Sequence, residues 1–201
     1  MPHIMMTRYA QRQQLLHWLT ALLMFTILPV SWVLVSVVEE SRPFFGWMDL
    51  HESLGLALLT VTVVRLALRA FDSAPAADPR TPGWMTGIAS CVHWGLLMLM
   101  ILMPVSGYVW ANGHGHDVAP FNVVQLPRIA FGRREIGDVA EWVHELCQWM
   151  LYVLLALHLG GVAYHVAVAR DGGLDRMLPP QRSCEHAMMR RQAPPLRDNA
   201  R

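Results

Sequence analysis

The sequence predicts an all-α integral membrane protein, a four-helix bundle with both termini in the cytoplasm. Of its 201 residues, 54% are hydrophobic and only 15% are charged, whereas soluble domains carry about a quarter charged residues. The charges are clustered, so four long stretches are almost free of them. Each stretch reaches the roughly 20 apolar residues that a helix needs to cross a hydrocarbon core about 30 Å thick. We expect one membrane domain over residues 1–180.

The four expected spans cover residues 15–38, 51–70, 84–110 and 139–169. We interpret the first as a retained helix, because its apolar run is too long for a signal peptide and lacks an A-x-A-like cleavage site. Pro29 within it is compatible with a membrane helix, since neighbouring helices can satisfy the freed carbonyl. Residues 181–201, rich in arginine and proline, are expected to form a flexible cytoplasmic tail.

The distribution of arginines predicts the orientation, since basic residues near span ends favour the cytoplasm. Placing both termini and the 71–83 loop inside leaves only four of the sixteen basic residues outside: Arg42, Arg128, Arg133 and Arg134. The outer side then also holds most of the acidic residues. The net charge of +1 suggests no nucleic-acid partner.

Histidines are the unusual feature of this apolar chain. Ionisable residues within membrane spans are energetically expensive, face the bundle interior and usually mark function. Six of the ten histidines lie within or at the ends of the expected spans: His17, His51, His93, His144, His158 and His165.

Two of these histidines share one helix face. His144 and His158 are fourteen residues apart, which at about 100° and 1.5 Å per residue returns to nearly the same face roughly 21 Å along the helix. His51 is expected at the depth of His144, near the outer side, and His17 at the depth of His158, near the inner side. These depths predict two bis-histidine sites stacked across the bilayer.

Haem suits such sites, because low-spin iron accepts two axial imidazoles and a four-helix bundle provides an apolar slot for the macrocycle. We therefore expect two b-type haems. Zinc would require four ligands with cysteine or carboxylate help, which the spacing does not supply. The three cysteines are scattered, and no C-x-x-C-H sequence for covalent haem attachment occurs.

Spacing leaves some roles open at the inner site. His165 lies seven residues after His158 on nearly the same face, so it could replace His158 as a ligand or exchange protons at the inner surface. His93 is a further competitor. Arg65 lies fourteen residues after His51 and is a candidate partner for haem propionates, whereas for Arg69 snorkelling to the membrane surface is the better interpretation.

The loop between the third and fourth spans is less informative. His114 and His116 form an H-G-H sequence that could bind a metal, although a solvated loop is the favoured interpretation. Arg133 and Arg134 could steer a small anion toward the outer site or serve as ordinary loop arginines.

Short motifs along nearly the whole chain resemble the bacterial di-haem cytochrome b561 family. Their order in the four-span context makes the set specific. They are L-L-H-W around His17, D-L-H-E-S-L-G from Asp49, V-V-R-L-A-L-R from Val63, W-M-T-G from Trp84, M-P-V-S-G-Y from Met103, V-H-E-L from Val143 and L-H-L-G-G-V-A-Y-H from Leu157. The 111–137 loop carries no specific match.

The resemblance implies that His17, His51, His144 and His158 are the axial ligands, which favours His158 over His165. It also implies a multi-pass protein of the bacterial inner membrane that passes electrons to ubiquinone. Some members are described as superoxide oxidases, in which periplasmic superoxide gives up its electron and quinone is reduced. By position, His165 and Arg80 become candidate quinone-site residues.

Two other functions remain open. A haem-bearing anchor subunit could link a dehydrogenase or hydrogenase to the quinone pool. A haem carrier or membrane sensor is the non-enzymatic alternative, and the lack of a long soluble domain disfavours sensing.

Overall fold

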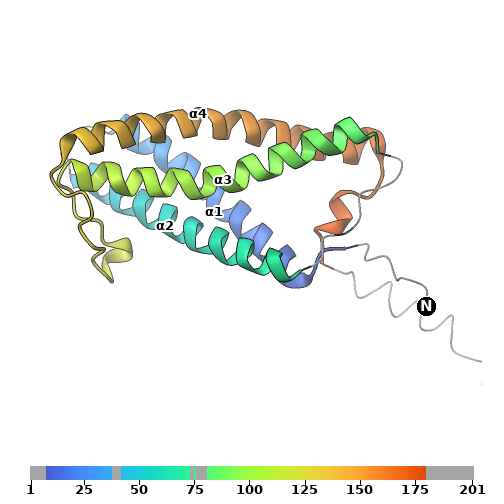
Figure 1. The fold of residues 1–201 in the computed structure, drawn as a ribbon, viewed down its shortest axis with the longest axis horizontal. Helices are drawn as coiled ribbons and strands as arrows, with labels where there is room; N and C mark the ends of the chain where they lie inside the picture. Colours follow the sequence, from blue (N-terminus) through green and yellow to red (C-terminus); the bar gives the residue numbers. More distant parts are fainter. Residues whose placement is uncertain (1–7, 38–41, 73–74, 76–80, 180–201) are drawn as a thin grey trace, which may run out of the picture.

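Four long helices make up the membrane bundle (Figure 1). The computed structural model describes residues 8–37, 42–72, 75 and 81–179. Within them the helices are α1 (Gln11–Ser36), α2 (Arg42–Phe71), α3 (Gly83–Gly113) and α4 (Arg134–Tyr164), and these described residues include no strand. The all-α prediction is confirmed. Arg80 and the predicted tail over residues 181–201 lie outside the described residues.

All four helices begin before the expected spans, whereas α1 ends at Ser36, two residues before its expected end. α1 begins at Gln11 and runs through Pro29. α2 begins at Arg42, nine residues before the expected span, so His51 lies within the helix rather than at its start. Polar residues near the membrane surface can still hydrogen-bond as helix, which a hydropathy pattern does not detect. The α-helical part of α4 ends at Tyr164, and a π-helical turn, η2 (His165–Ala169), follows it.

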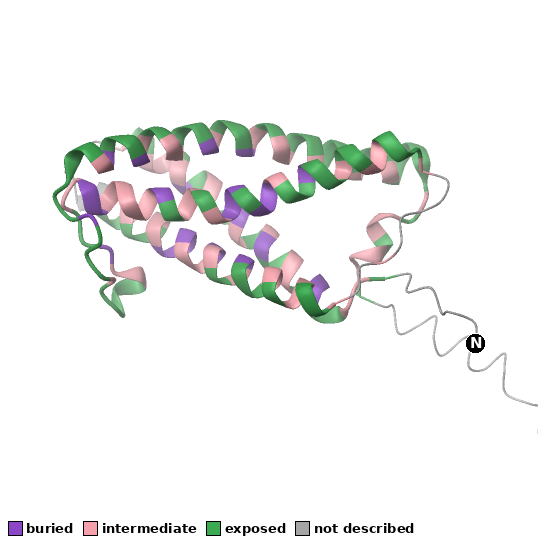
Figure 2. Cartoon of the chain, in the orientation of Figure 1, coloured by how far each residue is buried: buried purple, intermediate pink, exposed green. Residues whose placement is uncertain are grey.

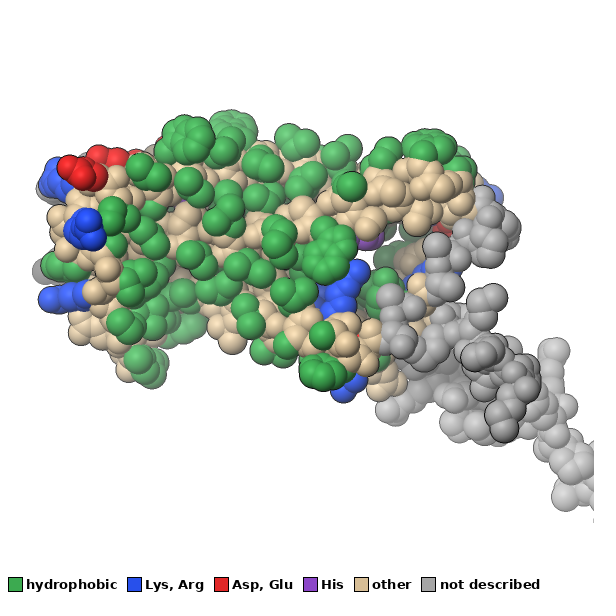
Figure 3. Space-filling model, viewed as in Figure 1, with side chains coloured by type: hydrophobic (Ala, Val, Ile, Leu, Met, Phe, Trp, Pro, Cys, Tyr) green, Lys and Arg blue, Asp and Glu red, His purple; other side chains and the backbone are tan. Residues whose placement is uncertain are grey.

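The outer faces of the helices are apolar and exposed, as lipid contact requires. All four are long and apolar enough to span a membrane. Buried residues line the inner faces, while exposed residues cover the outside (Figure 2). In the space-filling view, hydrophobic side chains cover the length of the bundle, and charged side chains lie mainly toward its ends (Figure 3).

A shared apolar core holds the bundle together near its middle. α1 packs on α2, and α3 packs on α4 along most of their length (Figure 1). Glycines allow the close approach of α3 and α4, because a Cβ at Gly95 would lie 2.7 Å from Leu154 Cδ1. The buried core residues come from all four helices: Met24, Leu58, Val92, Leu96, Leu97, Leu99, Met100, Cys147 and Leu151.

The α3–α4 connection folds back onto the bundle. It contains a 3-10 turn, η1 (Pro120–Asn122), and the backbone N–H of Phe121 donates to Ser53 Oγ on α2 (2.7 Å). Asn112, which is almost completely buried, holds the connection together. Its Oδ1 accepts from the N–H of Ile129 (3.1 Å), and its Nδ2 donates to the carbonyl of His116 (3.3 Å).

At the opposite end, the segment after α4 crosses to α1. It includes a 3-10 turn, η3 (Leu174–Arg176). Trp18 Nε1 donates to the carbonyl of Met177 (2.9 Å), and Gln14 Nε2 donates to the carbonyl of Arg176 (3.1 Å). The crossing segment thereby ties the end of α4 to the start of α1.

Candidate functional site

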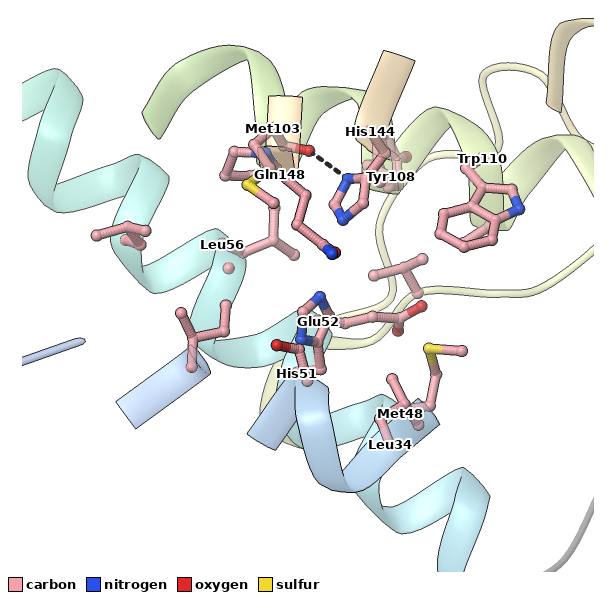
Figure 4. A pocket seen from close by; sticks show the side chains of 18 of the residues that line it. Leu34, Met48, His51, Glu52, Leu56, Met103, Tyr108, Trp110, His144 and Gln148 are labelled. Carbon is pink, nitrogen blue, oxygen red and sulfur yellow. Dashed lines mark hydrogen bonds between the residues drawn. The ribbon is translucent and has the colours of Figure 1, made fainter. Parts of the chain in front are cut away.

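A cavity of about 710 Å³ opens between the four helices at the end where α3 connects to α4. This volume lies within the range of about 300–1,000 Å³ that is typical of cofactor and ligand pockets. His51 on α2 and His144 on α4 both line it and face each other (Figure 4). Their ring centres are 6.2 Å apart.

His144 is held in a defined orientation. Its Nδ1 lies 3.0 Å from the carbonyl oxygen of Met103, so Nδ1 must carry a proton and donate it (Figure 4). The other ring nitrogen of a neutral imidazole is then an acceptor, which is the tautomer that binds a metal through Nε2. Gly107 leaves room for the ring, because a Cβ there would lie 3.1 Å from His144 Cε1.

His51 is less constrained by hydrogen bonds. Its Nδ1 is buried and has no hydrogen-bond partner in the described structure. A buried polar atom without a partner is unfavourable. The Nδ1 atom of His51 therefore lacks the hydrogen-bond partner that a buried ring nitrogen normally has. Glu52 and Gln148 line the same cavity beside the two histidines (Figure 4).

Three histidines gather at the other end of the bundle. His17 on α1 and His158 on α4 have ring centres 6.3 Å apart, nearly the same separation as the first pair. His93 on α3 lies closer to His158, at 5.3 Å. The structure therefore brings together both predicted pairs and places the competing histidine against one of them.

Arg65 approaches the same cluster. Its Nη2 lies 3.2 Å from His17 Nδ1, and since a guanidinium only donates, His17 Nδ1 accepts this bond. Arg69 instead stacks over the ring of Trp94, 4.9 Å from its centre. Of the two arginines, only Arg65 contacts a histidine of the cluster in the described structure.

His165 begins the π-helical turn η2 and faces the segment that crosses to α1. Its Nδ1 lies 2.6 Å from Asp171 Oδ2. Burial alone would raise the pKa of Asp171, but hydrogen bonds from the N–H of Gly173 (2.9 Å) and from His165 hold that pKa below its usual range. Asp171 was not predicted from the sequence. The only signal for this contact in the sequence is that Asp171 follows His165 by six residues.

The remaining predicted residues belong to neither histidine pair, although His114 and His116 line the same cavity as His51 and His144. Arg133 precedes α4, Arg134 is its first residue, and both are exposed near the His51–His144 end. His116 is exposed, as expected of a solvated loop. His114 differs, because its side chain is only 26% exposed and packs between α3 and α4.

Four spanning helices with histidine pairs facing each other across the interior define a membrane protein built to hold a cofactor between its helices. The family model for prokaryotic cytochrome b561 matches residues 8–180, and the chain belongs to this family. Membership implies a b-type haem. The protein is thus a multi-pass bacterial membrane cytochrome b with an electron-transfer role.

Curated relatives are similar over most of their length. The chain is 26% identical over 177 residues to "Probable superoxide oxidase CybB" of Yersinia pestis, covering 87% of this chain and 98% of that protein. It is 23% identical to "Cytochrome b561 homolog 2" of Escherichia coli (strain K12), covering 85% of this chain and 91% of the relative. It is 24% identical to "Cytochrome b561 homolog 1" of the same organism, covering 87% of this chain and 98% of that relative.

Proposed function

We propose that the protein is a di-haem cytochrome of the bacterial inner membrane that carries electrons from periplasmic superoxide to ubiquinone. In this proposal His51 and His144 hold one haem, His17 and His158 hold the other, and both chain termini are cytoplasmic. Each haem would supply reversible one-electron oxidation and reduction.

The spacing of the imidazoles is the observation that carries the haem assignment. A bond between a metal and an imidazole nitrogen is about 2 Å long, so two rings bound to opposite sides of one iron have centres roughly 6 Å apart. The pairs His51–His144 and His17–His158 have centres 6.2 and 6.3 Å apart. The 5.3 Å between His93 and His158 is too short for an iron ion between them.

Arg65 is proposed as a partner of a haem propionate. To bind iron through Nε2, His17 would need its proton on Nδ1, and it could then no longer accept from Arg65. Ligation would therefore release the guanidinium, which now lies 3.2 Å from the ring. A carboxylate is the natural new partner, because guanidinium binds it with two parallel hydrogen bonds.

The proposed quinone site lies near the His17–His158 pair. Reduction of ubiquinone to ubiquinol consumes two electrons and two protons, so a proton donor is needed close to the aqueous phase. His165 is suited to this role, since its Nδ1 lies 2.6 Å from Asp171 Oδ2 and this contact orients its ring. Arg80 is a second candidate quinone-site residue.

Superoxide as the donor is supported by the name of the Yersinia pestis relative and by positive charge near the His51–His144 end. Arg133 and Arg134 are exposed there, and neither forms an ion pair within the described residues. Unpaired guanidinium groups would attract a small anion. In the balanced reaction, two superoxide ions, one ubiquinone and two protons give two O₂ and one ubiquinol.

The test uses the purified protein in detergent, with the haem count established from its absorption spectrum. Superoxide is then supplied with and without ubiquinone while haem reduction is followed. We expect rapid reduction by superoxide and reoxidation when ubiquinone is added. A protein with two haems that superoxide does not reduce would contradict the proposed donor.

A second candidate function is the haem-bearing anchor subunit for a dehydrogenase or hydrogenase. The α3–α4 connection exposes large apolar side chains, including Phe121 (60%), Val123 (79%) and Ile129 (60%), which a partner subunit would cover. This candidate is favoured if superoxide fails and a purified dehydrogenase subunit reduces the haems instead.

A further inference from the structure

Three potential metal ligands meet beside the cavity, where α3 ends and α4 begins. His114 follows the last residue of α3, while Asp138 and Glu141 lie in the first turns of α4. One ligand atom from each side chain lies within 4.8 Å of the other two. None of the three belongs to the histidine pairs discussed above.

Close packing of two glycines creates this meeting point. A Cβ at Gly113 would collide with the backbone of Gly137, lying 2.6 Å from its nitrogen. A Cβ at Gly137 would lie 2.8 Å from His114 Nδ1. The imidazole of His114 therefore occupies space on α4 that only glycine leaves free, immediately beside Asp138.

A hydrogen bond at Nδ1 of His114 leaves Nε2 as the ring nitrogen that faces the carboxylates. Its Nδ1 lies 3.1 Å from the carbonyl oxygen of Trp110, and because a carbonyl only accepts, Nδ1 carries a proton. In the neutral imidazole, Nε2 is then a lone-pair donor for a metal, and a backbone carbonyl on the other nitrogen is a typical support for a metal-bound histidine. Nε2 lies 3.2 Å from Asp138 Oδ1, which is also an acceptor.

A cation bound between the three groups would satisfy this arrangement. Asp138 and Glu141 are three residues apart on one helix face, where like charges repel. Within the described residues, no arginine forms an ion pair with either carboxylate. Two carboxylates and a neutral imidazole match a divalent ion, and the imidazole favours a transition metal such as Zn²⁺ over Mg²⁺ or Ca²⁺.

We propose that His114, Asp138 and Glu141 bind a divalent first-row transition metal of the Zn²⁺ class. Three protein ligands leave a fourth position open to water or another small ligand. His114 and Glu141 also line the 710 Å³ cavity, so the bound cation lies at its edge and offsets the negative charge of the carboxylates there. The proposal does not depend on the identity of the electron donor or on the number of haems.

The test is equilibrium dialysis of the full-length protein, as purified with its haem, against Zn²⁺ at pH 7.5, with zinc counted by mass spectrometry. Asp138→Asn is the main variant, because the Asp138 side chain is 68% exposed and its replacement should not disturb folding. His114→Ala is the second variant. His116→Ala is the matched control, since it removes a histidine from the same loop outside the cluster.

We expect one zinc per chain in the wild type and in His116→Ala, with binding weakened at least about 10-fold in Asp138→Asn and His114→Ala. A large excess of Mg²⁺ should not displace the zinc. Equal zinc binding by the wild type and Asp138→Asn would overturn the proposal. No zinc binding by the wild type would also overturn it and would identify the contact as an ion pair between protonated His114 and Asp138.

Discussion

The imidazole rings of His51 and His144 face each other across the cavity with their centres 6.2 Å apart. Only His144 has a hydrogen bond that sets its tautomer, from Nδ1 to the carbonyl of Met103. His51 Nδ1 is buried without a partner. The pair therefore combines one imidazole whose orientation is set by a hydrogen bond with one whose Nδ1 has no partner in the described structure.

Replacing His144 with alanine tests this pair directly. We expect the haem content to fall from two per chain to one, because His51 alone would leave one axial position of the iron unfilled. The absorption spectrum of the pyridine complex measures the haem content. His116→Ala should retain both haems, and retention of both by His144→Ala would refute the assignment.

His93→Ala distinguishes the histidines at the other end. We expect this variant to keep two haems, because the 5.3 Å between the His93 and His158 rings does not accommodate an iron ion. His158→Ala should lose one haem. The pairing would be wrong if His93→Ala lost a haem and His17→Ala did not.

Arg65→Ala should preserve the haem count but lower the midpoint potential of one haem by tens of millivolts, because a nearby positive charge stabilises the reduced form. A redox titration followed at the haem absorption bands measures this change. Arg69→Ala is the matched control, since its guanidinium stacks over Trp94. Equal shifts in the two variants would argue against a specific role for Arg65.

Gly107→Ala should destabilise the His144 site. The added Cβ would lie 3.1 Å from the His144 ring, and overpacking of this kind typically costs about 1–3 kcal/mol. We expect haem loss at a lower temperature in a thermal melt. Gly87→Ala, also on α3, meets nothing within 4 Å and should melt no earlier than the wild type.

Asp171→Asn should slow ubiquinone reduction by about 10-fold. This is less than the roughly 100-fold or more that a positioned proton donor contributes, because the variant removes only the group that orients His165. The pKa of Asp171 is held below its usual range. Its contact with His165 is therefore fully present above about pH 4 and is lost as the pH falls through the lowered value. The variant at pH 7 should thus behave like the wild type at strongly acidic pH.

Rates of ubiquinol formation by the wild type and the variant at pH 7, where the contact is fully present in the wild type, measure this effect. The matched control is Asp175→Asn, which makes the same change at an exposed position of the same segment. Equal losses of activity in the two variants would argue that the segment matters only for structure.

The helices were predictable because a membrane imposes a simple requirement on length and polarity. Their ends were not, since α2 continues as helix through Trp47 and Asp49 where the apolar pattern has stopped. The in-phase spacing of His144 and His158 also follows from helix geometry alone, and the partners expected from depth do lie opposite them.

Contacts between residues from different elements required the structure. The support of His144 by the Met103 carbonyl depends on how α3 packs against α4. The cluster of His114, Asp138 and Glu141 depends on the close approach of Gly113 and Gly137. The bond between His165 and Asp171 depends on the turn after α4.

By itself, the sequence determined that four apolar helices cross the membrane and at which depth each carries a histidine, because both follow from the regular rise of a helix and the fixed thickness of a bilayer. Only the tertiary structure decided which rings lie about 6 Å apart, which nitrogen of His144 carries the proton and which carboxylates approach His114. These depend on how the helices rotate and pack against one another, and no single helix carries that information in its own sequence.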